Sequence, residues 1–314
     1  MGNETDLISL LEFKSKMAAD PYGILSSWND SVNFCKWHGI TCSSKHHRVA
    51  SLKVQGMSLS GTISPYTGNL TFLSGENSCR ARLFKEACYT FPQFKQPHWK
   101  DPTFCWKNLS SLQRFSVASN HMEGNIPNEM GRITSLTLLA MGDNNLVGSI
   151  PSTLYNISSI AMLSVTQNQL QGKLPANIGL TLPNLQIFEI GMNQFHGSVP
   201  VSWTNASVQL EIFDVYANSF TGQVPIDRGN LNGLQLLNLG NNFLGNNSSQ
   251  DLAFITSLSN CTNLRGLSLS DNNFGGVLPS TIVNMSTLMS ITLGRNQISG
   301  RIPAYIGILS ICMD

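Results

Sequence analysis

The chain of 314 residues contains few charged residues and no excess of either sign. Asp, Glu, Lys and Arg make up 12% of the sequence, about half the share usual in soluble domains. The 19 basic residues nearly balance the 18 acidic ones, which leaves a formal net charge of +1. Because nucleic-acid binding normally needs a basic face, we expect no nucleic-acid partner.

Long apolar runs and enzyme motifs are also missing. No stretch of about 18 apolar residues occurs, so we expect no membrane span in this chain. The N-terminus from Met1 to Asp6 lacks the basic start and apolar run of a secretory signal peptide. Phosphate-binding glycine loops, zinc-protease and serine-hydrolase motifs and a kinase catalytic loop are absent. We therefore expect no enzyme, no cofactor and no bound metal.

Leucine and asparagine, in contrast, are unusually common, at 38 Leu and 31 Asn. A buried amide costs about 2 kcal/mol or more unless it is hydrogen-bonded, so this abundance suggests a structural task for Asn. One Asn recurs in steps of 24, 24, 25, 25, 24, 30 and 24 residues, at Asn120, Asn144, Asn168, Asn193, Asn218, Asn242, Asn272 and Asn296. Apolar residues precede each Asn at fixed positions, and Gly and Pro follow most of them.

This spacing is that of the leucine-rich repeat, L-x-x-L-x-L-x-x-N-x-L. The L-x-L segment predicts a short strand with alternate residues inward, and the inward Asn can bond to the backbone of neighbouring repeats. We predict an α/β solenoid, a right-handed superhelix of stacked repeats with a parallel β-sheet on its concave side and helical turns on its convex side. The core pairs of that sheet are Phe115/Val117, Leu163/Val165, Phe213/Val215 and Leu267/Leu269.

Three sets of segments resemble plant proteins. The repeat endings Gly148-Ser149-Ile150-Pro151 and Gly300-Arg301-Ile302-Pro303 resemble the plant-specific class of leucine-rich repeats. Leu10 to Lys14, Ser27-Trp28-Asn29 and the run C-K-W-H-G-I-T-C from Cys35 to Cys42 are similar to the N-terminal cap of plant receptor-like kinases. The longer repeat, 242–272, resembles the immune subfamily of these kinases. The resemblance implies a helical cap, with a helix near residues 6–18, and an extracellular or plasma-membrane ectodomain.

The pattern divides the chain into five segments. They are the cap (1–48), a first repeat (49–73), an atypical insertion (74–107), further repeats (108–303) and a tail (304–314). The insertion is interpreted as a mistranslated or retained non-coding stretch, with an island that contacts a ligand as the alternative. It lacks the C-x-x-C spacing of a zinc site. The tail ends before another strand can form, and we interpret the chain as a truncated ectodomain without transmembrane or kinase segments.

The cysteines and the glycosylation motifs favour a protein that passes through the secretory pathway. Cys35 and Cys42 flank a Trp in a cap with little other core, and we predict a disulfide between them. Cys261 is expected to be a buried small apolar residue, and Cys312 has no assigned partner. N-x-Ser/Thr motifs, which are candidate glycosylation sites, occur at Asn3, Asn29, Asn69, Asn108, Asn156, Asn205, Asn246, Asn247, Asn260 and Asn284.

The residues between the core leucines are expected to face outward on the concave sheet. The candidate ligand-binding residues among them are Asp143, Gln167, Glu189, Met192, Asp214, Tyr216, Asn238, Asp271 and Arg295. Glu189, Asp214 and Tyr216 adjoin across two repeats, which favours an extended peptide with a basic residue.

We therefore expect extracellular recognition of a peptide or protein ligand, in plant immune perception. The resemblance also implies a co-receptor leucine-rich-repeat kinase as a partner. One alternative is a secreted inhibitor that binds a microbial cell-wall hydrolase through the same surface. The other is a non-functional product of a truncated gene.

Overall fold

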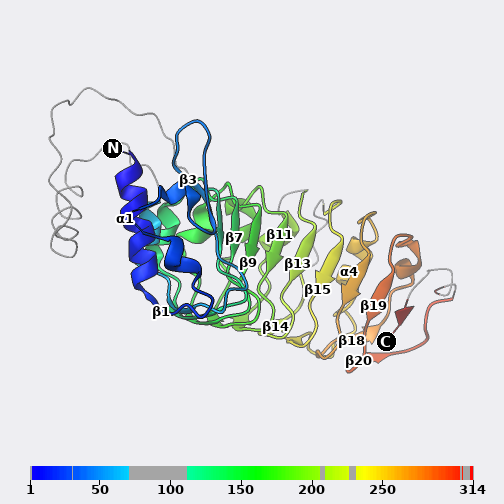
Figure 1. The fold of residues 1–314 in the computed structure, drawn as a ribbon. Coiled ribbons are helices and arrows are strands. Elements are labelled where there is room, and N and C mark those ends of the chain that lie inside the picture. The colour runs from blue at the N-terminus through cyan, green and yellow to red at the C-terminus, as the bar shows by residue number, and fades with distance from the viewer. Residues whose placement is uncertain are drawn as a thin grey trace.

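The structure is a computed structural model that describes residues 2–29, 31–70, 112–205, 209–225, 231–304, 306 and 312–313. The repeats stack side by side into an elongated solenoid, and helix α1 (Gly2–Ser15) lies against its N-terminal end (Figure 1). The predicted leucine-rich-repeat solenoid with an N-terminal cap is confirmed. The predicted insertion, 74–107, lies outside the described residues.

One long sheet, called the first sheet below, has 11 strands in chain order. The strands are β2 (Ile40–Cys42), β3 (Val49–Lys53), β5 (Arg114–Ser116), β7 (Leu138–Ala140), β9 (Met162–Ser164), β11 (Ile187–Glu189), β13 (Ile212–Asp214), β15 (Leu236–Asn238), β17 (Gly266–Ser268), β19 (Ser290–Thr292) and β21 (Cys312–Met313). Strand β2 pairs antiparallel with β3, and the later pairs are parallel. The predicted core residues are buried in or directly after these strands.

The tail corrects one expectation. Cys312 and Met313 pair with Ser290 and Ile291 of β19, so the chain does form a further strand after residue 304. Two residues are enough because the neighbouring strand already presents its free backbone groups in the right register.

A second sheet, which the sequence reading did not predict, follows the asparagines. Its eight strands are β1 (Met17–Ala19), β4 (Ser60–Thr62), β6 (His121–Asn125), β8 (Asn145–Gly148), β10 (Gln169–Gly172), β12 (Gln194–Gly197), β14 (Ser219–Gly222) and β16 (Phe243–Leu244). In β6, β8, β10 and β12 the apolar residue two positions after the Asn is buried between exposed neighbours, as in Met122 and Leu146, which is the alternation of a half-buried strand. Strands β18 (Gly275–Val277) and β20 (Gln297–Ser299) pair separately beyond the longer repeat.

Short helical turns carry the chain from the second sheet to the next strand of the first sheet, as predicted. They are η3 (Pro65–Asn69), η4 (Asn128–Arg132), η5 (Leu154–Asn156), α3 (Ile178–Thr181), η6 (Val201–Asn205), α4 (Ala253–Leu258) and η7 (Ser280–Asn284). In the longer repeat, the buried carboxylate of Asp251 holds the loop before α4 and ties it to the start of β18. Its Oδ2 accepts hydrogen bonds from the backbone N–H groups of Asn246, Ser248 and Gly275 at 2.9–3.0 Å.

The eight phase-locked asparagines form the predicted inward ladder. Each Nδ2 donates to two carbonyls of its own repeat and one of the preceding repeat, and each Oδ1 accepts from a backbone N–H of the preceding repeat. The ladder satisfies buried backbone groups that the strands leave unpaired. It therefore joins each repeat to the one before it.

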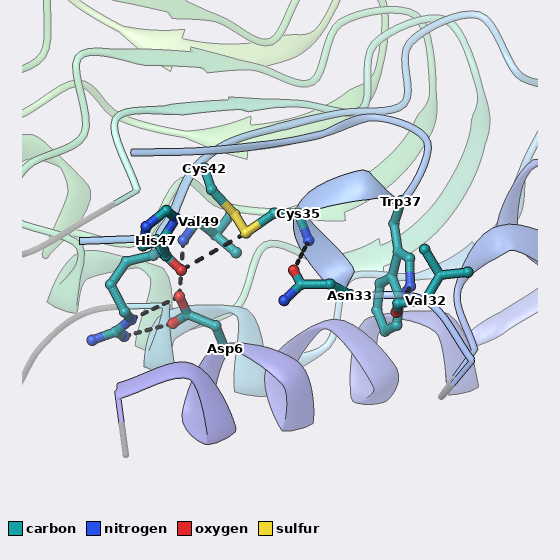
Figure 2. Close-up of a disulfide and its surroundings, with 9 residues drawn as sticks. Asp6, Val32, Asn33, Cys35, Trp37, Cys42, His47 and Val49 are labelled. Atoms are coloured by element: carbon teal, nitrogen blue, oxygen red, sulfur yellow. Dashed lines mark hydrogen bonds and ion pairs between the residues drawn. A yellow bond between two sulfur atoms is a disulfide. The ribbon is translucent and has the colours of Figure 1, made fainter. Parts of the chain in front are cut away.

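The cap is held together by stacked aromatic side chains and a disulfide, and its Phe13 packs edge-on against Phe115 of β5. Trp28 stacks on Trp37 with ring centroids 5.4 Å apart, and the predicted Cys35–Cys42 disulfide is formed (Figure 2). Helix α1 begins earlier than the expected residues 6–18 and ends at Ser15. Within this helix, Asp6 is fully buried and was not anticipated from the sequence.

The Asp6 carboxylate joins the cap helix to strand β3. It accepts hydrogen bonds from the Arg48 guanidinium and, at 2.9 Å, from the backbone N–H of Val49 (Figure 2). Because both charged groups are buried, each compensates the desolvation of the other. The carboxylate thus positions α1 against the start of the first sheet.

Candidate functional site

The outer face of the first sheet carries the predicted rows of outward side chains. In each three-residue strand the middle residue is buried in the core, so the flanking residues point away from it. Strand register places one row in line across the repeats: Ser116, Ala140, Ser164, Glu189, Asp214, Asn238, Ser268 and Thr292. The repeat alignment had predicted this row.

At the middle of this face the structure brings together four candidate residues. Glu189 and Asp214 are register partners on β11 and β13. The backbone N–H of Met192 donates to the Tyr216 carbonyl at 2.7 Å. Tyr216 is 37% exposed and Met192 is 50% exposed, so both offer apolar surface to solvent. Two carboxylates and two exposed large side chains therefore lie on adjacent repeats.

A glycine in the next repeat, Gly240, makes room for the tyrosine ring. Gly191 and Gly240 hold the positions equivalent to Tyr216 in the flanking repeats. A Cβ atom added at Gly240 would lie 3.3 Å from the Tyr216 Cδ2, closer than most side-chain contacts. The ring thus lies against the Gly240 backbone, where any larger residue would displace it. The small neighbours leave Tyr216 as the only aromatic residue of its row among the described repeats.

Asp214 also orders the backbone beneath Tyr216. Its Oδ1 accepts a hydrogen bond from the Tyr216 N–H at 2.8 Å, and the Asn238 side chain bonds to the same carboxylate. Burial raises the pKa of Asp214 above its ordinary value, while these two hydrogen bonds act in the opposite direction. Asn238 therefore helps to hold the Asp214 carboxylate in place, and that carboxylate in turn holds the backbone of Tyr216.

Met192 and four further candidates lie along the edge of the face, where the chain turns from the first sheet to the second. Asp143, Gln167, Met192, Asp271 and Arg295 all have positive φ, between 53° and 57°. Non-glycine residues adopt this left-handed conformation only where a turn requires it. Asp143 and Gln167 line a shallow polar hollow of about 360 Å³. The Arg295 Nη1 donates to Asp271 Oδ1 at 2.9 Å, so these two residues pair with each other.

A row of apolar residues on the outer face was missed by the sequence reading. We call it the apolar stripe, and it consists of Leu138, Met162, Ile187, Ile212 and Leu236. These side chains start five consecutive strands and are half-buried, so each keeps part of its surface in solvent. The signal is present in the repeat alignment, because five successive positions that the repeat pattern places outward hold Leu, Met or Ile.

Most glycosylation candidates lie in turns. Asn156 and Asn284 are the last residues of η5 and η7 and are exposed, whereas Asn69 at the end of η3 is half-buried. Asn29, Asn246, Asn247 and Asn260 are also exposed. Asn108 and the side chains of Asn3 and Asn205 lie outside what the structure describes. All ten remain predictions as modification sites.

Two further observations concern the described ranges alone. Within them, no three His, Cys, Asp or Glu side chains lie close enough together to hold a metal ion. None of the helices there has the length and hydrophobicity of a membrane span. Cys261 is buried, as expected, and burial raises the pKa of its thiol to about 11.

Comparison with known proteins gives matches at both ends of the chain. Residues 3–43 match the model of the leucine rich repeat N-terminal domain, and residues 263–285 match that of the leucine rich repeat. The chain is also similar to the LRR receptor-like serine/threonine-protein kinase EFR of Arabidopsis thaliana. The two are 50% identical over 72 residues, which are 23% of this chain and 7% of the kinase.

Two solved structures share the architecture. One is the LRR ectodomain of the plant membrane receptor kinase GASSHO1/SCHENGEN3 from Arabidopsis thaliana, in complex with CASPARIAN STRIP INTEGRITY FACTOR 2 (TM-score 0.68, 25% identity, 96% of this chain and 33% of that one). The other is the Arabidopsis receptor kinase HAESA in complex with the peptide hormone IDA and the co-receptor SERK1 (TM-score 0.55, 26% identity, 96% and 59%). The chain spans 59% or less of the length of each of these three relatives.

Proposed function

We propose that this chain, a homologue of the leucine-rich-repeat ectodomains of plant receptor-like kinases, recognises an extracellular peptide or protein ligand in plant immune perception. The ligand lies on the outer face of the first sheet. The observation that carries the proposal is the grouping of Glu189, Asp214, Tyr216 and Met192 on adjacent repeats at the middle of that face. The proposed location is the extracellular side of the plasma membrane.

Tyr216 and the two acids have separate tasks in recognition. Tyr216 supplies a flat apolar surface with a hydroxyl at its end, and it loses little rotamer freedom on binding. Glu189 and Asp214 attract a basic side chain and determine where along the sheet it binds. The hydrogen bond from the Tyr216 N–H to Asp214 couples the two tasks, because the acid also holds the backbone of the aromatic residue.

A co-receptor leucine-rich-repeat kinase is proposed as a partner in addition to the ligand. The support is the HAESA complex, in which a receptor kinase, a peptide hormone and the co-receptor SERK1 occur together. In this proposal the peptide is held on the first sheet, and the co-receptor contacts the complex only once the peptide is bound. Binding of the peptide alone is therefore the step to test first.

A random linear peptide library displayed on phage, selected on the full chain, supplies the ligand for this test. For the selected peptide we predict at least about a tenfold loss of affinity for Tyr216→Ala, because a central anchor is removed. Asp214→Asn should lose affinity in a salt-sensitive way, because it removes a charge but keeps an acceptor for the Tyr216 N–H. Surface plasmon resonance measures both.

Ser270→Ala is the matched control, since Ser270 holds the same repeat position as Tyr216 two repeats further along. It should leave the affinity unchanged. Unchanged affinity in Tyr216→Ala and Asp214→Asn as well would place the binding surface elsewhere and overturn the proposal.

A further inference from the structure

The apolar stripe is unusual for a sheet face that points to solvent. Leu138, Met162, Ile187, Ile212 and Leu236 are register partners on five neighbouring strands, so their side chains form one continuous row. Each flanks a middle residue that fills the core, so the stripe lies on the opposite side from the core. Apolar rows of this kind on a soluble surface commonly mark interaction sites.

The stripe has defined ends. On the N-terminal side the same row continues with Arg114 on β5, which is exposed and charged. On the C-terminal side it reaches Gly266 on β17, where a Cβ atom would lie only 2.7 Å from Leu236 Cδ1. The Leu236 side chain therefore extends over the glycine, and Ser290 follows in the row. Within this row, the large apolar side chains are therefore limited to these five strands.

The stripe runs alongside the acidic pair. Ile187 and Ile212 start the strands that end in Glu189 and Asp214. Glu211, directly before Ile212, brings a third carboxylate to the same two repeats, and its Oε2 accepts a hydrogen bond from Gln235 at 3.2 Å. Lys and Arg are absent from the described face positions of β11, β13 and β15. The middle of the stripe is thus apolar with acidic surroundings, which suits an apolar ligand that also carries positive charge.

We propose that the stripe binds a short extended peptide in which apolar residues adjoin one basic residue. The apolar side chains lie along the stripe, and the basic side chain reaches Glu189 and Asp214. This inference rests on the proposed function and names the class of its ligand. Strands about 4.8 Å apart make the stripe about 19 Å long, which an extended chain covers with about six residues at about 3.3 Å each.

The test uses the full chain and synthetic peptides of about eight residues, long enough to cover the stripe. In the first peptide Val alternates with Ser on both sides of one central Lys. In the second every Val is replaced by Ser, and in the third the Lys is replaced by Glu. Isothermal titration measures each against the wild type and the Ile187→Thr/Ile212→Thr double variant. Thr keeps the β-branched shape of a strand residue while it removes apolar surface.

We expect the first peptide to bind the wild type at least about tenfold more tightly than either of the other two. The double variant should bind the first peptide at least about tenfold more weakly. Val147→Thr is the matched control, because Val147 is an exposed valine on the second sheet. It should bind like the wild type, and circular dichroism should show all variants folded.

The remaining outcomes would overturn the inference. If Tyr216→Ala weakens binding of the first peptide and the double variant does not, the stripe has no part in recognition, although the proposed function stands. If none of the three peptides binds the wild type, the stripe does not recognise this class of ligand. If the wild type instead forms dimers that the double variant abolishes in sedimentation, the stripe is an interface between two copies of the chain.

Discussion

Each ladder asparagine makes hydrogen bonds that no other residue type reproduces at its position. Asn218 donates to the carbonyls of Ile190, Val215 and Tyr216 at 3.0–3.2 Å and accepts from the Phe195 N–H at 2.9 Å. One side chain thus satisfies four backbone groups from two repeats. Its amide supplies both donor and acceptor without a charge to desolvate, which explains why Asn rather than Asp recurs.

Asn218→Ala tests this account of the ladder. The change leaves buried backbone groups without partners, so we predict a loss of about 2–4 kcal/mol in the free energy of unfolding. Chemical denaturation measures it. Asn145→Ala is the control, since Asn145 is exposed, and it should change stability by less than about 0.5 kcal/mol. Equal effects of the two changes would contradict a structural role for the ladder.

The raised pKa of Asp214 predicts a pH dependence of stability. Because the folded state binds the proton more tightly than the unfolded state, the contribution of Asp214 is fully present below its ordinary pKa of 3.8. It is lost as pH rises through the raised pKa. Wild type should therefore gain stability relative to Asp214→Asn as pH falls from about 7 towards about 3. Denaturation of both proteins across this range measures it, and parallel pH profiles would contradict the shift.

Among the elements, the cap contains one contact that a local sequence motif predicts and one that joins residues far apart in the sequence. The Cys35–Cys42 disulfide spans a sequence separation of 7 and could be predicted from the motif around Trp37. The contact between Asp6 and Arg48 could not, because a separation of 42 residues leaves no periodic signal. Short second-sheet strands such as β8 were missed for a different reason. Their alternation is only about three residues long and ends at a glycine with positive φ.

Asp6→Asn tests whether the buried carboxylate holds the cap in place. The change removes the carboxylate that pairs with the buried Arg48 guanidinium, and we predict a loss of about 3–5 kcal/mol in the free energy of unfolding of the cap. Amide hydrogen exchange in α1 and β3 reports this loss locally. Glu4→Gln is the control, because Glu4 lies on the same helix and is exposed. Unchanged exchange in Asp6→Asn would show that the ion pair is not needed.

At the scale of the whole molecule, repetition explains what could be predicted. A fixed period places equivalent residues in register, so the row through Glu189, Asp214 and Asn238 followed from alignment alone. The side-chain relations within that row did not follow. Alignment showed neither that Asp214 accepts a hydrogen bond from the Tyr216 N–H nor that Arg295 forms an ion pair with Asp271. The apolar stripe does appear in the alignment, as Leu, Met or Ile at five successive outward positions.

In the proposed function, a ligand binds over the middle of the first sheet, beside Glu189 and Asp214. A zero-length carbodiimide cross-link tests it most directly, because it joins a peptide Lys only to a carboxylate in contact with it. With the Val–Ser peptide that carries one central Lys, peptide mapping by mass spectrometry should find the link at Glu189, Asp214 or Glu211, and Tyr216→Ala should reduce its yield. A link chiefly at Asp143, at Asp271 or in the cap, unaffected by Tyr216→Ala, would contradict the account.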